Sequence, residues 1–535
     1  MALIAGIDIG NSTTEIVVCE GTTPVAWDRR PTRGIKGSAA SLQAAAALLK
    51  NIERVHQITV DHVAVAPWRP VLTKASTIHE PQPHTGRLSI VSCSQNSVTG
   101  NSAVSGLPWV INQPIISGEL IAIVPAVVGY EQAAQIINDN PSVVGAIVER
   151  DEAVLIAGRL NRTIPIVDCA DTLLATAAQK LMVEVRPAGQ RVSTVTDVWA
   201  VSHALDLQQS EQSDIALLAQ WTAHERAAVF AMFDVAPPRV DMSTQDSVTW
   251  NDGRTEDTFY AIDSIDSMSV GAIRRHNQHE VDDFWALDIT GCLVQIGLHS
   301  PTSSHSRAIV TAELATTEPT DLDIADYVSV PVTVCESEAR AAAIGALTTP
   351  GIAPDAVIID IGGGTIDLIA SKAELSVAGA GEMLTAAVAH LLEVPLGAAD
   401  WIKRTAAQRV ESPQVVLNED GSKNFVDSLS TQSFVGKLVA PGPSGLLSFS
   451  SIFQLAEWRL ARQGFKKRII AENIGRLIEN YKHADLVLVG GPAIDDELLP
   501  AVSALPNVRA VGRGNVAGIL GQRYCVAYGL TQMVN

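Results

Sequence analysis

Short apolar runs alternate with longer amphipathic stretches along most of this chain, a pattern typical of α/β folds. After an opening strand–turn–strand, the pattern predicts a helix over residues 41–55 and a strand over 60–66. Strands and Ala-rich helices then alternate between about 115 and 250, and a helix over 336–347 leads into an apolar stretch that begins at Val357. The apolar runs have the length of buried parallel strands, so we expect sheets covered by helices.

Turn-rich segments interrupt this alternation and indicate domain boundaries. From Pro81 to Pro114 the chain is rich in Ser, Asn, Gly, Thr and Pro, which predicts a loop or an interdomain connection. The alternating region that follows is predicted to be an inserted domain, whose two links to the body form a natural hinge. A second turn-rich stretch from about 396 to 450, including Asn418-Glu419-Asp420-Gly421, predicts a small extra insert.

Two stretches far apart in the sequence repeat the same chemistry. Ile4 to Thr14 and Val357 to Asp367 each begin as an apolar strand, reach an Asp, and turn through Gly and small hydroxyl residues. Such turns let backbone N–H groups approach phosphate oxygens, and the Asp holds Mg²⁺, usually through water. The predicted phosphate and metal residues are Asp8, Gly10, Asn11, Ser12 and Thr13, and Asp360, Gly362, Gly363, Gly364 and Thr365.

A third buried-strand run, Ala484 to Val489, ends in Gly490-Gly491, where a base and ribose can lie against bare backbone. A single Asp-x-Gly turn has an ordinary hairpin as its alternative. Two such turns followed by a Gly-Gly loop favour a nucleotide clamp instead. Their order and spacing resemble the actin/Hsp70/sugar-kinase ATPase superfamily, which implies a two-lobed, RNase H-like α/β fold.

That resemblance also implies a catalytic residue. Glu338 lies on an Ala-rich helix shortly before the second hairpin, where the superfamily orients the attacking water, so we assign it a catalytic role beside Asp8 and Asp360. An exposed helical Glu paired with a nearby Arg is the alternative. The segment from Gly379 through Gly381 opens a helix whose N–H groups can face the nucleotide. The same glycines are explained equally well if they are needed for close packing of the helix against a strand.

Composition and charge narrow the class of protein. The 535 residues carry a net charge of −20, which argues against a nucleic-acid or anionic-membrane partner. The basic cluster from Arg459 to Arg468 is interpreted as a solvated helix face. The six cysteines show no zinc or disulfide spacing. No signal peptide or membrane-length apolar run is visible, so a cytoplasmic protein is expected.

A narrower resemblance extends over nearly the whole chain. The chain resembles the large subunit of the diol and glycerol dehydratase reactivating factors, although residues 170–330 match poorly and Gly362 to Asp367 is closer to the general Hsp70-type loop. The matching stretches are Ile4 to Glu15, Gly34 to Gly37, Gly145 to Asp151, Pro165 to Asp168, Gly345 to Gly351, Gly379 to Met383, Val487 to Gly491 and Gly512 to Asn515.

The resemblance implies an Hsp70-like ATPase domain in three parts, 1–85, 256–395 and 453–535, with a swivelling domain at 86–255 and a small insert at 396–452. It also implies a divalent ion in the swivelling domain, held by Asp151, Asp168 and a hydroxyl residue for which Ser105 is the match. Both acids lie at strand ends, where carboxylates can converge on a cation. Solvated turn acids are the alternative.

The implied function is a chaperone-like ATPase that exchanges damaged cobalamin in an adenosylcobalamin-dependent diol or glycerol dehydratase for intact cofactor. ATP or ADP with Mg²⁺ would be the cofactor. A small subunit would complete an α2β2 heterotetramer, and the dehydratase would be the client. A metabolite kinase, a polymerising actin-like protein and an iron–sulfur activator of dehydratases are the alternatives. The sequence leaves open which dehydratase is served and whether a microcompartment encloses the pair.

Overall fold

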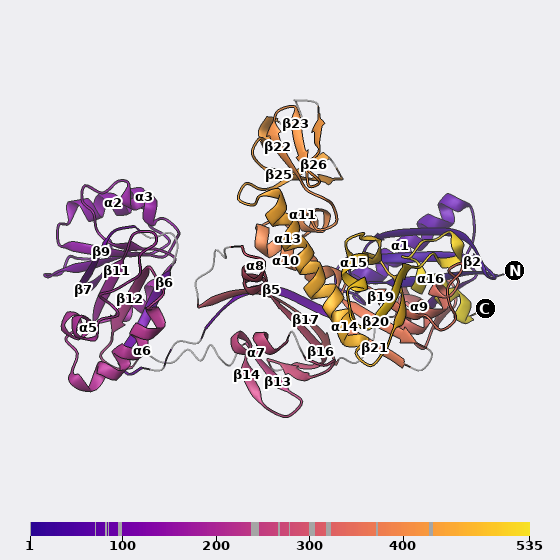
Figure 1. The fold of residues 1–535 in the computed structure, drawn as a ribbon, viewed down its shortest axis with the longest axis horizontal. Helices are drawn as coiled ribbons and strands as arrows, with labels where there is room; N and C mark the ends of the chain where they lie inside the picture. The colour runs from indigo at the N-terminus through magenta and orange to yellow at the C-terminus, as the bar shows by residue number, and fades with distance from the viewer. Residues whose placement is uncertain are drawn as a thin grey trace. The chain divides into compact units, whose positions relative to one another are not determined.

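The computed structural model describes residues 2–69, 71–80, 83, 85–94, 99–236, 246–265, 268–277, 279–298, 305–316, 323–370, 373–426, 432–443 and 445–534. The chain forms two compact units (Figure 1). Unit 1 comprises Met1–Ile78, Thr244–Ser300 and Ala308–Asn535, and unit 2 comprises His79–Ser243 and Pro301–Arg307.

A five-stranded sheet with the order β18-β4-β1-β2-β3 forms the first lobe of unit 1. β1, β2 and β3 form an antiparallel meander, and β4 and β18 add parallel strands beside β1. Helix α1 (Ala39–His56) begins at Ser38, whose side chain accepts a hydrogen bond from Ser41 N. The strands are β1 (Leu3–Ile9), β2 (Thr13–Glu20), β3 (Thr23–Pro31), β4 (His62–Val65) and β18 (Val332–Val334).

The second lobe repeats this topology with the order β21-β20-β19-β27-β28. β19 and β20 form the hairpin, β21 continues it, and β27 and β28 are the parallel strands. The strands are β19 (Val357–Ile361), β20 (Thr365–Ala370), β21 (Ala373–Ala378), β27 (Ala484–Val489) and β28 (Val508–Arg513). Two sheets of one topology confirm the predicted two-lobed α/β fold.

Helices α9 (Glu338–Ala346) and α16 (Cys525–Val534) are in direct backbone contact. A Cβ on Gly345 would lie 2.1 Å from Cys525 O, and one on Gly529 would lie 1.8 Å from Ala341 O. A Cβ on Gly6 of β1 would lie 1.9 Å from Ala527 O. Only glycine permits these approaches, which bring the first turns of both helices close to the ends of β1 and β19.

A six-stranded sheet, β14-β13-β15-β16-β17-β5, was not anticipated. The placement of 256–395 in the ATPase domain stays a prediction, and the first part of this range joins β5 in the six-stranded sheet. Strand pairing depends on contacts between residues far apart in the sequence, which the hydrophobic pattern of one strand does not encode. The elements are β5 (Val71–His79), β13 (Ser247–Trp250), β14 (Thr255–Asp257), α7 (Thr258–Ile265), β15 (Ile273–His276), β16 (His279–Asp288), α8 (Ile289–Gln295) and β17 (Ser306–Ala315).

Unit 2 is an α/β domain around a seven-stranded sheet, β10-β9-β8-β7-β11-β12-β6, in which β7 to β10 are parallel. Its alternation of strands and helices agrees with the predicted inserted domain. The elements are β6 (Leu88–Ser94), β7 (Ser102–Val110), β8 (Leu120–Val124), α2 (Tyr130–Asp139), β9 (Val143–Val148), α3 (Ala153–Ala157), β10 (Ile166–Val167), α4 (Thr172–Ala177), β11 (Lys180–Val185), α5 (Val198–Ala204), α6 (Gln212–Thr222) and β12 (Ala227–Met232).

The loop predicted from Pro81 to Pro114 is wrong where β6 and β7 lie, while Pro81 itself is outside the described residues. β6 pairs with β12, and β7 lies between β8 and β11. Serine is compatible with a strand when neighbouring strands satisfy the backbone, and Leu88 and Ile90 are buried beside such serines. Residue composition alone therefore overestimated the loop.

The small insert is a five-stranded antiparallel sheet, β24-β23-β22-β25-β26, between α11 (Leu396–Ile402) and α13 (Leu455–Lys466). The predicted turn at Asn418-Glu419-Asp420-Gly421 joins β23 to β24, and Gly421 has a φ of 84° there. The strands are β22 (Gln408–Ser412), β23 (Val415–Asn418), β24 (Lys423–Phe425), β25 (Leu438–Gly442) and β26 (Gly445–Ser450).

The predicted solvated face from Arg459 to Arg468 is wrong for two of its cations. The side chains of Arg462 and Lys466 are 1% exposed, and each forms ion pairs with acidic side chains. Their acidic partners lie far away in the sequence, so the helix pattern gave no sign of them. A π-helical turn (Lys467–Ala471) and α14 (Glu472–Leu477) follow.

Among the described residues, no single helix is long and apolar enough to cross a membrane. In the described part of the chain, α10 (Gly381–Leu392) and α11 reach that length and composition only when taken together, with a bend of 104° between them. All six cysteines lie in the described part of the chain, and no disulfide joins any two of them.

Candidate functional site

The two predicted phosphate loops are equivalent hairpins, one in each lobe. Gly10 N donates to Thr13 O at 2.9 Å between β1 and β2, and Gly362 N donates to Thr365 O at 2.9 Å between β19 and β20. The same four-residue turn therefore closes both hairpins.

The structure brings these hairpins into contact. A Cβ on Gly363 would lie 2.5 Å from Ser12 Oγ, and one on Gly364 would lie 2.8 Å from Asn11 Nδ2 and 2.7 Å from Val71 Cβ. Any side chain at these glycines would push the two lobes apart. The hairpins thus meet in one cleft of ≈ 1710 Å³, which all of the predicted hairpin residues line.

Each strand-end Asp faces a second acid across its hairpin. Asp8 is opposite Glu15 in the register of β1 and β2, and Asp360 is opposite Asp367 in the register of β19 and β20. Glu15 and Asp367 were not predicted as site residues. The signal was present in the sequence, because an acid follows each Asp at the same spacing in both repeats.

Burial and mutual repulsion disfavour the charged forms of these carboxylates. Desolvation, followed by the charges of Glu338 and Glu15, raises the pKa of Asp8 well above its ordinary value. Desolvation and Asp367 raise the pKa of Asp360 to about 8, and desolvation raises that of Asp367 to about 6. Among the described residues, Asp8, Asp360 and Asp367 form no ion pair. An oxygen-rich set of this kind suits a hard divalent cation.

Glu338 begins α9, and its partner is Lys36. Lys36 Nζ donates to Glu338 Oε2 at 2.7 Å, and the Lys36 side chain is 8% exposed. Burial opposes the charged form of Lys36, but Glu338 and Asp8 raise its pKa above the ordinary value. The alternative of a Glu338–Arg340 pair is not observed, because Arg340 pairs with Glu336. Sequence reasoning recognised the stretch around Lys36 but missed its place in the site.

Arg523 is a second missed residue. Its Nη1 donates to Glu15 Oε1 at 3.1 Å and to Thr13 Oγ1 at 3.4 Å, and its Nη2 donates to Gly491 O at 3.4 Å. It therefore ties the first hairpin to the Gly-Gly loop of the other lobe. No motif surrounds Arg523, so nothing in the sequence indicated this position.

The Gly490-Gly491 loop lies directly against the end of β19. Gly490 has a φ of 88°, and a Cβ there would lie 2.4 Å from Asp360 Oδ1 and 2.3 Å from Ile361 O. Both the conformation and the contact require glycine. The loop therefore lies beside the carboxylate cluster, and its predicted contact with a base and ribose stays a prediction.

The segment from Gly379 to Glu382 supports the second hairpin. Gly379 N donates to Gly364 O, Gly381 N to Gly362 O and Glu382 N to Gly363 O. The Glu382 carboxylate accepts from Asn11 Nδ2 at 3.2 Å and from Ser12 Oγ at 3.1 Å. These contacts are those of the packing alternative, and a role for Gly379 and Gly381 in cofactor binding stays a prediction. Glu382, a missed residue, joins the two hairpins.

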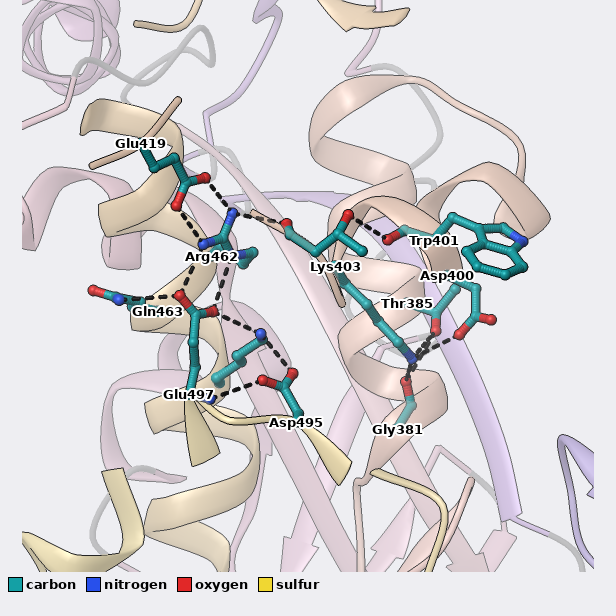
Figure 2. A network of polar contacts seen from close by, with 12 residues as sticks. Gly381, Thr385, Asp400, Trp401, Lys403, Glu419, Arg462, Gln463, Asp495 and Glu497 are labelled. Atoms are coloured by element: carbon teal, nitrogen blue, oxygen red, sulfur yellow. Dashed lines mark hydrogen bonds and ion pairs between the residues drawn. The ribbon is translucent and has the colours of Figure 1, made fainter. Parts of the chain in front are cut away.

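The wall of the cleft between α10 and α11 combines apolar and cationic groups. Leu396, Trp401 and Ile494 line it and are partly exposed. Lys403 is buried there, and its Nζ donates to Gly381 O at 2.6 Å and to Thr385 Oγ1 at 2.5 Å (Figure 2). Desolvation lowers the pKa of Lys403. This mixture suits a heterocyclic base with an attached sugar.

In unit 2, Asp151 and Asp168 lie together beyond the carboxyl ends of β9 and β10. One ligand atom from each, with Cys169 Sγ, forms a group whose members lie within 4.8 Å of one another. Desolvation raises the pKa of Asp168 to about 6, and the charge of Asp151 adds to the shift. The two predicted acids are therefore brought together, and Cys169 is an additional candidate ligand.

Ser105 does not join this cluster, which corrects the predicted ligand set. Leu107 of β7 is level with Leu120 of β8, so Ser105 lies near the amino-terminal edge of the parallel strands. Asp168 follows their carboxyl-terminal edge, roughly 20 Å away at about 3.3 Å per residue. The hydroxyl residue beside β10 is Thr99, which pairs with Ile166, and its buried Oγ1 has no partner among the described residues.

Two family models match the chain. The diol dehydratase reactivase ATPase-like domain matches residues 263–534, and the DD-reactivating factor swiveling domain matches residues 110–233. The propanediol dehydratase-reactivating factor large subunit of Salmonella typhimurium is 25% identical over 99% of this chain and 98% of the relative. The diol dehydratase-reactivating factor large subunit of Klebsiella michiganensis is 24% identical over the same shares.

Solved structures show the same fold over the whole length. A nucleotide-free diol dehydratase-reactivating factor has a TM-score of 0.55 and a glycerol dehydratase reactivase has one of 0.56, each at 22% identity and 99% coverage of both chains. The ATPase-like model alone covers more than half of the residues. The chain therefore belongs to the diol dehydratase reactivase family.

Proposed function

We propose that this protein is a chaperone-like ATPase that reactivates an adenosylcobalamin-dependent diol or glycerol dehydratase by releasing damaged cobalamin. The observation that carries the proposal is the meeting of two equivalent Asp-bearing hairpins in one cleft, within a chain of this family. The fold by itself would not imply the activity, since unrelated functions share it.

Nucleotide phosphates would lie between the hairpins. Backbone N–H groups of the two turns and the side chains of Ser12, Thr13 and Thr365 would donate to phosphate oxygens. Asp8, Asp360 and Asp367 would hold Mg²⁺, directly or through water, and the ion would neutralise phosphate charge. Thr73 Oγ1 lines the same cleft, buried and without a partner among the described residues, which is consistent with a ligand there.

Glu338 would orient the attacking water, and Lys36 would hold the Glu338 carboxylate in place. Lys36 would also place a positive charge near the transferred phosphoryl group. Glu382 and Arg523 would fix the relative positions of the lobes, because each contacts elements of both. Hydrolysis would therefore depend on lobe closure.

Hydrolysis would act as a switch between two states of the large subunit. Nucleotides can shift such an equilibrium only by their difference in affinity for the two states. In the ADP state the protein would engage the dehydratase together with a small subunit, in an α2β2 assembly, and ATP would favour release. The chain passes between the two units at four points, because His79–Ser243 and Pro301–Arg307 both belong to unit 2, and we expect that unit to be the element that moves.

The carboxylate pair of unit 2 would hold a divalent cation. Asp151 and Asp168 supply oxygen ligands, and Thr99 or Cys169 would complete the set. The raised pKa of Asp168 indicates charge that a cation would neutralise. This ion would stabilise the loops at the carboxyl edge of the sheet rather than take part in hydrolysis.

A metabolite kinase is the alternative function, since the same cleft could accept a phosphate acceptor. A pull-down from the native cytosol distinguishes the reactivase from the kinase. Tagged protein is used as bait, once with Mg-ADP and once with Mg-ATP, and the bound proteins are identified. A cobalamin-dependent dehydratase retained with ADP and released with ATP is expected. If no dehydratase is retained in either state, and a small-molecule acceptor becomes phosphorylated, the kinase function replaces the proposal.

A further inference from the structure

Arg462 is buried in the wall of the nucleotide cleft, and all five of its N–H groups have acceptors. Its Nε and Nη2 donate to the two oxygens of Glu497 at 2.9 and 2.8 Å. Its Nη1 and Nη2 donate to the two oxygens of Glu419 at 2.7 and 2.8 Å, and Nη1 also donates to Thr405 O. Figure 2 shows the guanidinium between the two carboxylates. We refer to Arg462, Glu419 and Glu497 as the Arg462 clamp.

The clamp joins parts of unit 1 that are distant in the sequence. Glu419 lies in the turn between β23 and β24 of the small sheet, and Arg462 lies on α13. Glu497 precedes α15 (Leu498–Ser503), shortly after the Gly490-Gly491 loop. Glu419 also accepts from Ala407 N at 2.6 Å, in the connection that leads into the small sheet. All of these residues line the cleft.

A second buried cation strengthens the contact to the Gly-Gly loop. Lys466 Nζ lies 2.7 Å from Glu497 Oε2 and 2.5 Å from Asp495 Oδ2. Gln463 Nε2 donates to Glu497 Oε1 at 3.1 Å. Arg462 and its neighbours lower the pKa of Glu497 to about 2 despite partial burial, so this carboxylate is charged. Buried ionic networks of this kind fix one geometry rather than add much net stability.

The position of the small sheet and the position of the Gly-Gly loop are therefore linked through one guanidinium. A bidentate Arg holds each carboxylate in a fixed plane, which a single point charge cannot do. The chain enters the small sheet after α11 and leaves it before α13, and Leu438, Ala440 and Phe449 of the sheet pack in the same core as Trp458 of α13. The Glu419–Arg462 contact adds a polar link between the β23–β24 turn and α13.

We propose that the Arg462 clamp makes the small sheet a gate for the nucleotide: while Glu419 is held, the Gly490–Glu497 segment stays closed over the cleft, and loss of that contact speeds nucleotide release. This inference rests on the proposed nucleotide function and adds a regulatory element to the same site. Glu419 and Arg462 are positioning residues, since they act through the loop.

Stopped-flow release of a fluorescent ADP analogue from the full-length protein, with Mg²⁺ present, tests the gate. In Glu419→Gln the dissociation rate should rise at least about tenfold, because loss of a buried charge pair acts mainly on dissociation. Glu411→Gln is the matched control, because Glu411 forms an exposed pair with Lys423 within the same small sheet. Its dissociation rate should match that of the unaltered protein.

Arg462→Lys provides the second variant, since it keeps the charge and loses the two bidentate contacts. It should also release ADP faster. Hydrogen exchange in the ADP-bound protein should show lost protection in Gly490–Glu497 in both variants, even if their melting temperatures fall. Unchanged dissociation and unchanged protection there would overturn the gate. Failure of the unaltered protein to bind the analogue would instead overturn the proposed function itself.

Discussion

Lys36 Nζ lies 2.7 Å from Glu338 Oε2, which joins the loop before α1 to the first turn of α9. Glu338 is also the acidic residue in the first turn of α9, and both residues line the cleft between the hairpins. The pair combines the residue expected to orient water with a cation close to Asp8. In the proposed function, this pair would serve phosphoryl transfer.

Glu338→Gln should lower the single-turnover rate of ATP hydrolysis by about 10²- to 10⁴-fold, the range for removal of a general acid–base group, while ADP binding changes little. Lys36→Met should have an effect in the same direction. Rapid-quench hydrolysis and calorimetric ADP binding measure the two properties. Glu336→Gln is the control, because Glu336 is exposed in the same turn and pairs with Arg340. If Glu338→Gln hydrolyses ATP at the rate of the unaltered protein, Glu338 has no catalytic role.

Asp360→Asn should stabilise the nucleotide-free protein at alkaline pH. The ordinary pKa of an Asp is 3.8, whereas burial and Asp367 raise that of Asp360 to about 8. Between these values the folded chain keeps a proton that the unfolded chain releases, so stability falls as pH rises through this window. The loss is on the order of a few kcal/mol, and the variant should avoid it.

Thermal unfolding in EDTA at pH 5 and at pH 8 checks this prediction. Asp360→Asn should melt at a higher temperature than the unaltered protein at pH 8, with a much smaller difference at pH 5. The same variant should lose Mg²⁺-dependent stabilisation by ADP. If Asp360→Asn is less stable than the unaltered protein at pH 8, neighbouring groups stabilise the charged Asp360 carboxylate in the nucleotide-free chain.

Gly490→Ala should weaken both the fold and nucleotide binding. The φ of 88° and the 2.4 Å approach of a Cβ to Asp360 Oδ1 together cost about 1–3 kcal/mol or more. Denaturant unfolding and ADP calorimetry measure the two effects. Gly512→Ala is the matched control in the neighbouring β28, because a Cβ there meets no atom within 4 Å. If Gly490→Ala and Gly512→Ala have the same unfolding stability and the same ADP affinity, the Gly-Gly loop can shift away from β19.

Asp168→Asn should remove one divalent ion per chain without changing ATP hydrolysis. Asp168 is 2% exposed and lies with Asp151 in the cluster of unit 2. Mn²⁺ titration followed by electron paramagnetic resonance counts the bound ions. Glu152→Gln is the control, because Glu152 is partly exposed, follows Asp151 directly, and its side chain does not cap α3. An unchanged ion count would leave Asp151 and Asp168 as ordinary turn acids.

Much of the nucleotide site could be predicted because its residues are local in sequence. The hairpins at Asp8 and Asp360 are each a strand, an Asp and a glycine turn, and both were expected with their roles. Glu15 and Asp367 were also within reach, since each faces its Asp at the same spacing along the hairpin. Short-range hydrogen bonding and backbone sterics decide such features.

Other residues of the site could not have been found this way. Lys36, Arg523 and Glu382 come from loops or helix starts with no distinctive pattern, and each acquires its role from a partner hundreds of positions away. Ser105 failed as a ligand because strand register, rather than sequence proximity, decides which end of a sheet a residue occupies. Arg462 looked solvated because its acidic partners lie on other elements.

By itself, the sequence determined the two phosphate hairpins, the Gly-Gly loop, the alternating unit 2 and the family resemblance, because local propensity and short motifs carry that information. Only the tertiary structure decided which charges meet, which strands share a sheet and which cations are buried. Those outcomes depend on long-range packing, in which a buried charge persists only where the fold brings it an opposite charge or a hydrogen-bond partner.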